Sequence, residues 1–340
     1  KYKPKYFIIS NEKTFIKVKK KIKKTKTILQ KNYKKVISAK YKNDITIAAI
    51  PGLAGLEPTI ELVKNSKKIL IANKESIICG WNIIKTLAKK NKTTIIPIDS
   101  EHFSINKILK NYNDSDVEKI YITASGGPFL NTSISKFHKI TPTDAIKHPK
   151  WKMGKKISVD SATLMNKILE LIEAQKIFPF KYNKYEIIIH PQSLVHAIVK
   201  FKNGFSKLLY HEPNMIVPIT NAIFDSKVLI KKYLGPKNHN IQNLEFLKVD
   251  KKKFPAINLI PKLNNYISTP IVINAANEIL VDQFLKKNIS FKSIYAYLNT
   301  LLKDKNYKKY AIQKPINLKR IYLIDNWARN TMLRIIRNNN

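Results

Sequence analysis

The chain has 340 residues, a hydrophobic fraction of 44% and a formal net charge of +40. This length suits two or three domains of about 100 to 200 residues each, and the apolar residues are numerous enough to fill their cores. Its one cysteine, Cys79, excludes an internal disulfide and a cysteine-rich zinc site, which fits a reducing cytoplasm. The given sequence has no run of about eighteen apolar residues and no signal-peptide core, so we expect a cytoplasmic protein without membrane association.

The large positive charge comes almost entirely from lysine. Four of the 63 basic residues are arginines, which leaves 59 lysines spread along the chain; the arginines are Arg320, Arg329, Arg334 and Arg337. Because arginine forms paired hydrogen bonds with guanine and phosphate, this composition disfavours sequence-specific nucleic-acid recognition. Non-specific attraction to polyanions is still an expected by-product of the charge.

Strands and helices alternate through the first part of the chain. The apolar pattern predicts helices over Asn11–Leu29, Glu57–Asn65 and Asn73–Lys90, and strands at Tyr6–Ser10, Val36–Ser38, Ile45–Ile50, Lys68–Ala72 and Ile95–Ile98. This alternation is typical of βαβ units on a parallel sheet. A dinucleotide-binding sheet normally opens with a glycine-rich turn, but the first glycine here is Gly52. We therefore predict an α/β fold with an incomplete Rossmann-like parallel sheet.

Polar residues follow two of these strands at the point where each strand ends. Asn73, Lys74 and Glu75 come after one strand, and Asp99, Ser100 and Glu101 come after the next. Open α/β sheets bind ligands at the carboxyl ends of their strands, so we expect both sets to line one crevice. The alternative for each set is an ordinary helix cap.

Two segments in the middle of the chain have an unusual composition. Paired glycines follow a strand at Ile120–Thr123, and the run from Ala124 to Phe129 forms either a nest of N–H groups for an anion or a tight turn. The run from His148 to Gly154 sets a tryptophan and a methionine beside glycine and proline. This second pattern indicates either a mobile hydrophobic flap or a locally packed loop.

The run Ser158–Ala174 predicts a single amphipathic helix. Ser158, Asp160 and Ser161 are its candidate N-caps. The first turn of such a helix favours a phosphate near Ser161, with Lys167 adding charge, and a plain N-cap is the alternative.

Glu170 on this helix is a third carboxylate for the crevice. Asn166 and Lys167 lie four and three residues before it, so the three side chains can converge on one polar patch. An all-oxygen set of Asp99, Glu101 and Glu170 suits a hard divalent ion, Mg²⁺ or Mn²⁺, and disfavours zinc. The alternative is a solvated helix face without an ion.

The second half of the chain carries fewer polar patterns. Glu186–Phe201 predicts two strands joined by His-Pro-Gln-Ser, in which His190 and His196 are more often core residues than functional ones. Two prolines within Phe205–Phe224 indicate an edge strand or a loop before a helix. We expect the rest of a Rossmann-like domain in residues 1–98, an α+β catalytic domain in 99–225 with a flap at 125–156, a linker in 226–253 and an α-helical bundle in 254–340.

A series of motifs, in this order and at these separations, carries a resemblance to one family. The motifs are PGLAGLEPTIELVKNSKKILIANKESIICG, PIDSEH, TASGGPF, HPKWKMGKKISVDSATLMNK, LELIEA at Leu169–Ala174, HPQSLVH and NAANE. With them, the chain resembles 1-deoxy-D-xylulose 5-phosphate reductoisomerase from about Tyr6 to the C-terminal helices. This is the NADPH- and metal-dependent enzyme family of the methylerythritol phosphate route to isoprenoids, and its members are usually homodimers.

The resemblance implies a reaction and a set of site residues. The reaction is rearrangement and NADPH-dependent reduction of 1-deoxy-D-xylulose 5-phosphate to 2-C-methyl-D-erythritol 4-phosphate. The implied metal ligands are Asp99, Glu101 and Glu170, the implied catalytic residues are Lys74, Glu101 and His148, and the implied NADPH contacts are Asn73, Glu75 and Gly154. The implied substrate contacts are Lys74, Ser100, Glu101, Ser125, His148, Ser161, Asn166, Lys167 and Glu170.

The sequence also departs from the family pattern. The opening strand and its glycine-rich turn are missing, and Ala124 and Ile168 stand where the family commonly has glycine. Three hypotheses follow, in order of preference: the active enzyme, with its N-terminal segment absent from the given sequence; an inactive remnant that binds metal and sugar phosphate; and a polyanion-binding basic protein. The first predicts a homodimer with no specific nucleic-acid partner.

Overall fold

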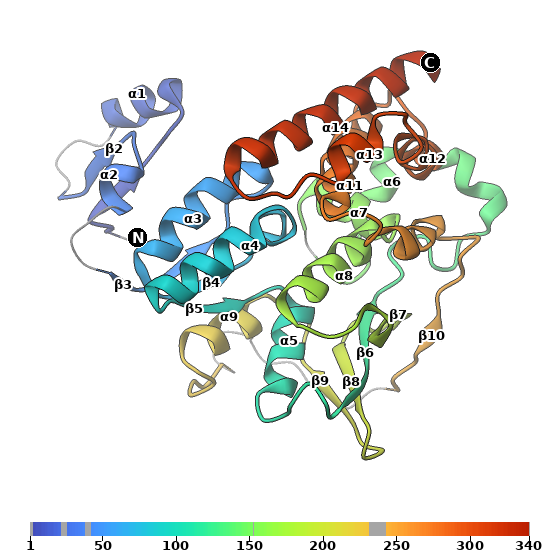
Figure 1. Cartoon of the computed structure of the whole chain (residues 1–340), viewed down its shortest axis with the longest axis horizontal. Coiled ribbons are helices and arrows are strands. Elements are labelled where there is room, and N and C mark those ends of the chain that lie inside the picture. The colour runs from blue at the N-terminus through green and yellow to red at the C-terminus, as the bar shows by residue number, and fades with distance from the viewer. Residues whose placement is uncertain (1–2, 22–25, 38–41, 152, 231–242, 340) are drawn as a thin grey trace.

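Three sheets and a C-terminal group of helices make up the part of the chain that the structure, a computed structural model, describes: residues 3–21, 26–37, 42–151, 153–230 and 243–339. Figure 1 shows the N-terminal strands and helices set to one side and the last helix lying across the top of the molecule. The architecture confirms the predicted α/β class, with an incomplete Rossmann-like parallel sheet, an α+β part and C-terminal helices.

The N-terminal unit is a two-stranded parallel sheet with two helices. Its elements are β1 (Tyr6–Ile8), α1 (Glu12–Lys21), β2 (Ile28–Gln30) and α2 (Lys34–Ile37). The first predicted strand is present, but the helix predicted to reach Leu29 ends at Lys21, and its residues 22–25 lie outside the described part. Leu29 instead lies opposite Phe7 in the sheet.

The strand predicted at Val36–Ser38 is wrong. Val36 and Ile37 belong to α2, and Ser38 lies outside the described residues. Asn32 Oδ1 accepts a hydrogen bond from the Lys34 N–H at 2.9 Å, and the Tyr33 carbonyl accepts from the N–H groups of Val36 and Ile37. This capped turn outweighs the β preference of two branched residues.

The second sheet is parallel and has three strands. Its order is β3 (Asn43–Ala48), β4 (Ser66–Ile71) and β5 (Thr94–Pro97), connected through η1 (Leu53–Gly55), α3 (Leu56–Lys64) and α4 (Lys74–Asn91). These elements confirm the predicted strands and helices within a few residues. The strands of this sheet end side by side, because Ile71 at the end of β4 lies opposite Pro97 at the end of β5.

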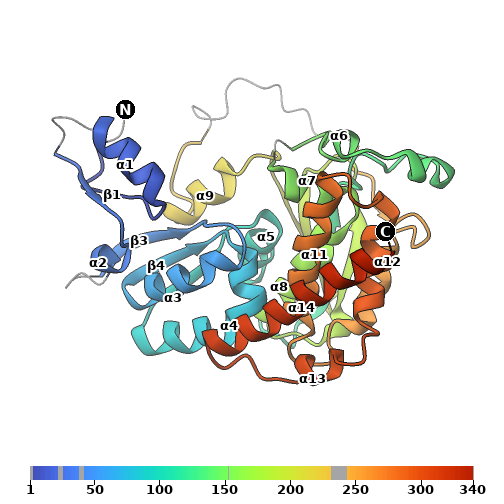
Figure 2. The same ribbon diagram turned by 90° about the horizontal axis from the view of Figure 1, so that it is seen from above.

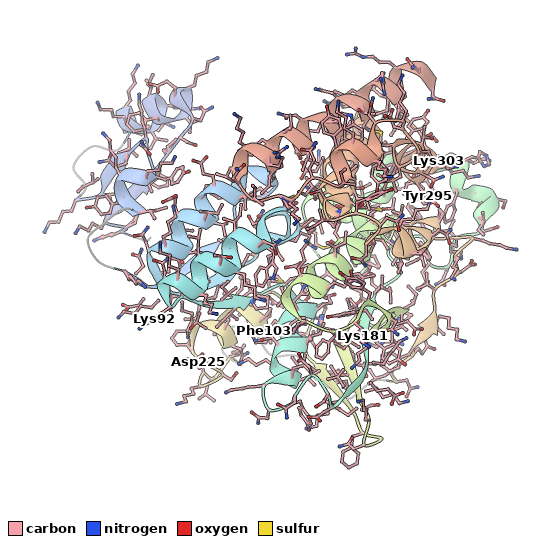
Figure 3. The ribbon with its side chains drawn as sticks, viewed as in Figure 1. Lys92, Phe103, Lys181, Asp225, Tyr295 and Lys303 are labelled. Carbon is pink, nitrogen blue, oxygen red and sulfur yellow. The ribbon has the colours of Figure 1, made fainter. Side chains whose placement is uncertain are left out.

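Successive side chains of β4 lie on opposite faces of this sheet. Ile69 and Ile71 belong to the main hydrophobic core, which also contains the buried residues of α3 and α4. Leu70 belongs to a smaller cluster with Phe103 of α5 (Ser100–Leu109) and Ala222 of α9 (Ile216–Ile223). Figure 3 shows Phe103 on α5. Helices therefore cover both faces, as a buried parallel sheet requires.

The third sheet is mixed and has the strand order β10-β7-β6-β8-β9. Its strands are β6 (Val117–Ala124), β7 (Tyr185–Ile189), β8 (Val195–Phe201), β9 (Ser206–Tyr210) and β10 (Leu247–Lys248). β6 and β7 are parallel, and the remaining pairs are antiparallel. The two strands predicted within Glu186–Phe201 are confirmed, and so are the edge strand and helix predicted within Phe205–Phe224.

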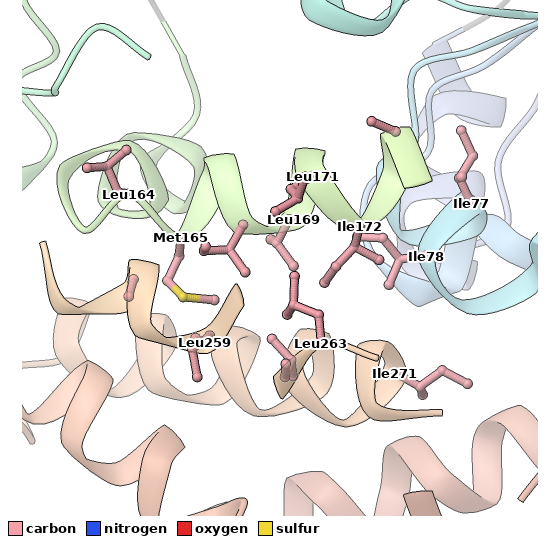
Figure 4. Close-up of a cluster of buried hydrophobic side chains, with 14 of the residues drawn as sticks. Ile77, Ile78, Leu164, Met165, Leu169, Leu171, Ile172, Leu259, Leu263 and Ile271 are labelled. Atoms are coloured by element: carbon pink, nitrogen blue, oxygen red, sulfur yellow. The ribbon is translucent and has the colours of Figure 1, made fainter. Parts of the chain in front are cut away.

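The single helix predicted over Ser158–Ala174 is wrong, because the structure has two helices there. These are α7 (Lys155–Ala162) and α8 (Met165–Ile177). They are separated at Leu164, whose backbone is in the left-handed conformation with a φ of 61°. Leu164 is only 1% exposed, so burial of its side chain compensates for a backbone conformation that leucine rarely adopts. Figure 4 shows Leu164 and Met165 at one end of α8, with Leu259 and Leu263 packed below the helix.

The C-terminal helices close the structure. They are η4 (Pro255–Lys262), α11 (Thr269–Leu285), α12 (Phe291–Leu301), α13 (Tyr307–Ala311) and α14 (Leu318–Asn339). Figure 2 shows α11 and α14 crossing beside α7 and α8. Shorter elements between β6 and β7 are η2 (Ile134–Lys139), α6 (Pro142–Ala145) and η3 (Tyr182–Lys184). Within the described residues, we find no helix with the length and apolar character that a membrane crossing needs.

Candidate active site

The site begins at the adjacent ends of β4 and β5. Asn73 follows β4 and caps α4, because its Oδ1 accepts the Ser76 N–H at 2.7 Å. Asp99 follows β5 and caps α5 in the same way. The two caps place Lys74 Nζ 3.3 Å from Asp99 Oδ2. Both polar sets predicted to follow the strands therefore lie at one edge of the sheet.

Three carboxylates meet at this edge. One oxygen each of Asp99, Glu101 and Glu170 lies within 4.8 Å of the others, although Glu170 comes from α8, far along the chain. Glu101 and Glu170 are 8% and 2% exposed. Carboxylates this close and this buried repel one another unless cations neutralise them, so the cluster suits a hard divalent ion.

Two lysines supply positive charge among these carboxylates. Lys74 Nζ donates to Asn166 Oδ1 at 2.7 Å and lies 3.5 Å from Glu170 Oε1. Lys167 Nζ contacts Glu170 Oε2 at 2.6 Å and also pairs with Glu101. Asn166 in turn donates to Glu170. The predicted convergence of Asn166, Lys167 and Glu170 on one patch of the helix is confirmed.

The shared burial shifts the pKa values of these groups in different directions. Burial favours the neutral amines, but the carboxylates outweigh it and raise the pKa of both Lys74 and Lys167. Burial raises the pKa of Glu101 to about 8, and the charge on Glu170 acts in the same direction. Burial also opposes ionisation of Asp99, but Lys74 outweighs it and holds the Asp99 pKa well below its usual range. The cluster therefore contains one carboxyl that exchanges a proton near neutral pH.

A buried histidine supports the carboxylates from behind. His102 is fully buried, and its Nε2 lies 2.8 Å from the Glu170 carbonyl oxygen. Its Nδ1 lies 3.4 Å from both Asp99 Oδ1 and Glu173 Oε2. Burial opposes its charge, but Glu173 and Asp99 together raise the pKa of His102 to about 9. A charged ring then forms ion pairs with both Asp99 and Glu173.

Ser125 and His148 face the same space from the other side. His148 Nδ1 accepts hydrogen bonds from the N–H groups of Lys150 and Trp151 at 3.1 and 2.9 Å. The neutral ring therefore carries its proton on Nε2, which donates to Ser125 Oγ at 3.0 Å. Ser125 Oγ also accepts from the Gly127 N–H at 3.1 Å, so its hydroxyl proton remains available for an anionic ligand.

The position of Ser161 corrects one prediction. Ser161 lies in the last turn of α7 and not at a helix start, so the N–H groups of a first turn do not surround it. It reaches the cavity because Gly127, at a φ of +64°, approaches its backbone closely; a Cβ on Gly127 would lie 2.9 Å from the Ser161 carbonyl oxygen. Ser161 and Ser125 therefore both line the same cavity.

These residues line one cavity of about 250 Å³. Trp151 and Met153 of the predicted flap also line it. Every metal, catalytic and substrate residue that the resemblance implied contributes to its wall: Lys74, Asp99, Ser100, Glu101, Ser125, His148, Ser161, Asn166, Lys167 and Glu170. The structure therefore brings together, around one cavity, residues from segments that are far apart in the chain.

A second, larger cleft of about 620 Å³ adjoins the cavity. Lys74 and Asn166 line both spaces. The three residues implied to contact NADPH, namely Asn73, Glu75 and Gly154, all line this cleft. Glu75 is 6% exposed, and its Oε2 accepts from Asn73 Nδ2 at 3.0 Å.

Comparisons with known proteins agree with this geometry. The family model described as 1-deoxy-D-xylulose 5-phosphate reductoisomerase matches residues 1–80, and two models of the C-terminal domains of that enzyme match residues 95–178 and 211–331. The 1-deoxy-D-xylulose 5-phosphate reductoisomerase of Pelagibacter ubique is 45% identical over 327 residues, 94% of this chain and 84% of the relative. The chain belongs to the 1-deoxy-D-xylulose 5-phosphate reductoisomerase family.

Other members of the reductoisomerase family show the same likeness. The enzyme of Wolbachia from Drosophila simulans is 44% identical, over 77% of this chain and 68% of its own length. A crystal structure of DOX-P reductoisomerase in complex with NADPH, fosmidomycin and magnesium matches with a TM-score of 0.90 and 32% identity, covering 99% of this chain and 87% of that one. The Zymomonas mobilis reductoisomerase in complex with NADPH gives a TM-score of 0.85 at 32% identity, covering 98% and 86%.

Several residues of this reductoisomerase site were missed or undervalued in the sequence. His190, Ser193, His196 and Met215 line the substrate-side cavity. His190 Nε2 and Ser193 Oγ are buried and have no hydrogen-bond partner among the described residues, so both are available to a ligand. The signal was present, since His-Pro-Gln-Ser follows β7, whose end lies beside the end of β6.

Proposed function

We propose that the chain catalyses the rearrangement and NADPH-dependent reduction of 1-deoxy-D-xylulose 5-phosphate to 2-C-methyl-D-erythritol 4-phosphate, a step of isoprenoid precursor synthesis. The observation that carries the proposal is the three-carboxylate cluster beside a cavity with phosphate-binding side chains. Family membership supports the same reaction. The proposal makes the protein an NADP-dependent oxidoreductase and isomerase.

Asp99, Glu101 and Glu170 fit a Mg²⁺ or Mn²⁺ ion. All three offer hard oxygen ligands, and their ligand atoms lie within 4.8 Å of one another. When bound, such an ion polarises the keto and hydroxyl oxygens of the sugar phosphate and stabilises the charge that develops there. Lys74 and Lys167 form ion pairs with the carboxylates, and His102 forms a further ion pair with Asp99.

The phosphate end of the substrate has its own group of side chains. Ser125, Ser161, Asn166 and Lys167 line the cavity and supply hydroxyl, amide and ammonium donors. His148 directs its Nε2 proton at Ser125 Oγ, which leaves the serine hydroxyl proton free for a phosphate oxygen. The phosphate therefore sets the orientation of the sugar relative to the carboxylates.

Lys74 and Glu101 are the remaining catalytic candidates. The pKa of Glu101 is about 8 in the metal-free chain, and a bound ion displaces this proton, so we propose that Glu101 acts as a metal ligand in the loaded site. Lys74 Nζ lies within 3.5 Å of Asn166, Asp99 and Glu170, between the cavity and the cleft. From this position its ammonium donates to an oxygen of the bound sugar and lowers the cost of negative charge on it.

The larger cleft fits the nicotinamide cofactor. It shares Lys74 and Asn166 with the substrate cavity, so we expect a dinucleotide in the cleft to lie next to the sugar. Bound NADPH supplies a hydride, which reduces the rearranged aldehyde. Asn73, Glu75 and Gly154 form the wall that orients the nicotinamide end.

We also propose a homodimer in the cytoplasm without a specific nucleic-acid partner. β9 is an edge strand of the mixed sheet, and Phe205 and Leu208 beside it are 66% and 43% exposed. An exposed apolar edge favours pairing with a second copy. The replacement Leu208→Lys is expected to raise the monomer fraction in sedimentation analysis; an unchanged monomer fraction would remove this edge as the interface.

A steady-state assay tests the enzymatic proposal. NADPH absorbance is followed with 1-deoxy-D-xylulose 5-phosphate and Mg²⁺, for the wild-type chain and for Glu170→Gln. We expect consumption that requires both substrate and metal, and a loss of about 100-fold or more in the variant. Circular dichroism confirms that the variant folds. If the wild-type chain is folded and binds Mg²⁺ and sugar phosphate but consumes no NADPH, the enzymatic proposal is wrong and the chain is an inactive remnant.

A further inference from the structure

A chain of polar contacts joins α11 to the start of α4. Asn277 Nδ2 on α11 donates to Asp160 Oδ1 on α7 at 2.7 Å. Lys156 Nζ donates to Asp160 Oδ2 at 3.0 Å and lies 3.5 Å from Glu75 Oε1. Glu75 Oε2 then accepts from Asn73 Nδ2. Three segments that are far apart in the sequence meet in this polar chain.

Most of the polar chain is buried. Asn277, Asp160 and Glu75 are 0%, 1% and 6% exposed, and the Lys156 side chain is 30% exposed. Two buried carboxylates are costly unless they are paired, and here they share one ammonium group. Asn277 satisfies the other oxygen of Asp160. Burial opposes the charge of Lys156, but Asp160 and Glu75 outweigh this effect and raise its pKa.

The polar chain forms one wall of the cleft of about 620 Å³. Asn73, Glu75, Lys156 and Asp160 all line that cleft, whereas Asn277 lies behind Asp160. Lys156 lies in the first turn of α7 and is the last residue of the predicted flap at 125–156. The side chain of Glu75 therefore contacts a lysine from the flap end, and the Asp160 that pairs with this lysine accepts a hydrogen bond from Asn277 of α11.

We propose that Lys156, held by Asp160 and Asn277, is a positioning residue that fixes Glu75 in the cleft wall and thereby sets the affinity for NADPH. This inference rests on the proposed function, because it assigns the cleft to the cofactor. Without the ammonium, Glu75 and Asp160 are left as two unpaired carboxylates in a buried wall, and we expect the Glu75 side chain to move. The metal ligands and the phosphate residues do not take part in the polar chain, so sugar-phosphate binding is preserved.

The test is an NADPH binding titration, followed by cofactor fluorescence without substrate, on the wild-type chain, Lys156→Met, Lys156→Arg and Asn277→Ala. We expect the Kd for NADPH to rise about tenfold in Lys156→Met and in Asn277→Ala, consistent with a lost hydrogen bond to a charged group. Lys156→Arg, which keeps the charge, should recover most of the affinity. In turnover, KM for NADPH should rise while KM for the sugar phosphate stays within about twofold.

Matched controls separate positioning from loss of stability. Thr269 is as buried as Asn277 on the same helix, and its Oγ1 forms a hydrogen bond of 2.6 Å with the Tyr307 hydroxyl, while neither residue lines the cleft. Thr269→Val should therefore lower the melting temperature and leave the Kd for NADPH unchanged. Lys64, paired with Glu61 at 2.8 Å on α3, serves as the lysine control in Lys64→Met.

The possible outcomes are distinguishable. If the wild-type chain binds NADPH and the Kd is the same in Lys156→Met and Asn277→Ala, this inference is overturned and the proposed function stays intact. An equal rise of the Kd in Thr269→Val and Asn277→Ala also overturns it, since general loosening of α11 then explains the effect. A wild-type chain that neither binds nor consumes NADPH overturns the proposed function together with this inference.

Discussion

At the scale of single residues, Glu101 links the acidity of the site to its metal affinity. Burial and the neighbouring Glu170 raise its pKa to about 8 in the metal-free chain, so below that pH the carboxyl is protonated. A divalent ion must displace this proton in order to bind Glu101. We expect the Kd for Mg²⁺ to increase as the pH falls from 8 to 6, by up to about tenfold per pH unit. Titration calorimetry in two buffers measures both the Kd and the released proton, and a Kd that is constant over this range contradicts the assignment.

His148 gives a second pH dependence, in stability. Burial lowers the pKa of His148 to about 4, below its usual value of about 6.5 in an unfolded chain. The unfolded chain therefore binds more protons between pH 6.5 and 4, and the stability contributed by the neutral ring is lost as the pH falls through this window. His148→Gln, which cannot titrate, should lose about 1 kcal/mol less stability than the wild-type chain between pH 7 and 5 in urea unfolding. Equal losses in both chains would show that His148 does not titrate differently on folding.

Residue-level prediction worked where local spacing decided the outcome. Asp99 and Lys74 follow strands that end side by side, and Asn166 and Glu170 are one helical turn apart, so sequence alone placed them on shared surfaces. The contact of Lys156 with Glu75 spans 81 residues and depends on how three elements pack, and no local pattern encodes it. Ser161 lines the cavity as predicted, but it lies in the last turn of α7 and not in the first turn of a helix.

At the scale of elements, the break between α7 and α8 is the main departure from the sequence pattern. The apolar period continues through Leu164, and nothing in its residue type predicts a left-handed φ of 61°. Tertiary packing decides the break, because Leu164 and Met165 are both buried in the core. The break places Ser161 in the last turn of α7 and Asn166 in the first turn of α8, and both residues line the cavity.

The left-handed residue predicts an unusual order of stabilities. Leu164→Ala removes a buried side chain and should cost about 2–4 kcal/mol. Leu164→Gly removes slightly more, but glycine adopts this φ without the penalty of about 1 kcal/mol that alanine retains. The glycine variant should therefore equal or exceed the alanine variant in stability, the reverse of the order within an ordinary helix. Urea unfolding of both variants measures the order, and an alanine variant that is more stable by 1 kcal/mol would contradict the strain at Leu164.

At the scale of the whole molecule, the net charge of +40 opposes folding through self-repulsion. Many lysines are exposed, and surface pairs such as Lys67 with Asp44 add little stability in water. Added NaCl screens the repulsion, so we expect the melting temperature to rise by a few degrees between about 0.05 and 0.5 M NaCl. Thermal unfolding across this series measures the effect, and a melting temperature that falls with salt would show that attractive ion pairs dominate.

The composition and the alternation of predicted strands and helices also predicted the α/β class and the C-terminal helices, because these features depend on many residues at once. The same patterns could not predict the strand order of the mixed sheet, since β10 pairs with β7 across a long separation in sequence. The strand predicted at Val36 failed for the opposite reason: one asparagine starts a short helix there. Both cases show that the periodicity of apolar residues predicts neither strand pairing over long sequence separations nor helices started by a single capping residue.

Binding of Mn²⁺, followed by electron paramagnetic resonance, tests most directly whether the three carboxylates hold one ion beside the phosphate pocket. We expect one saturable Mn²⁺ site per wild-type chain, a spectrum that changes when the sugar phosphate is added, and an affinity at least about 100-fold weaker in Glu170→Gln. Absence of a saturable site, or equal Mn²⁺ affinity in the wild-type and folded Glu170→Gln chains, would contradict the account.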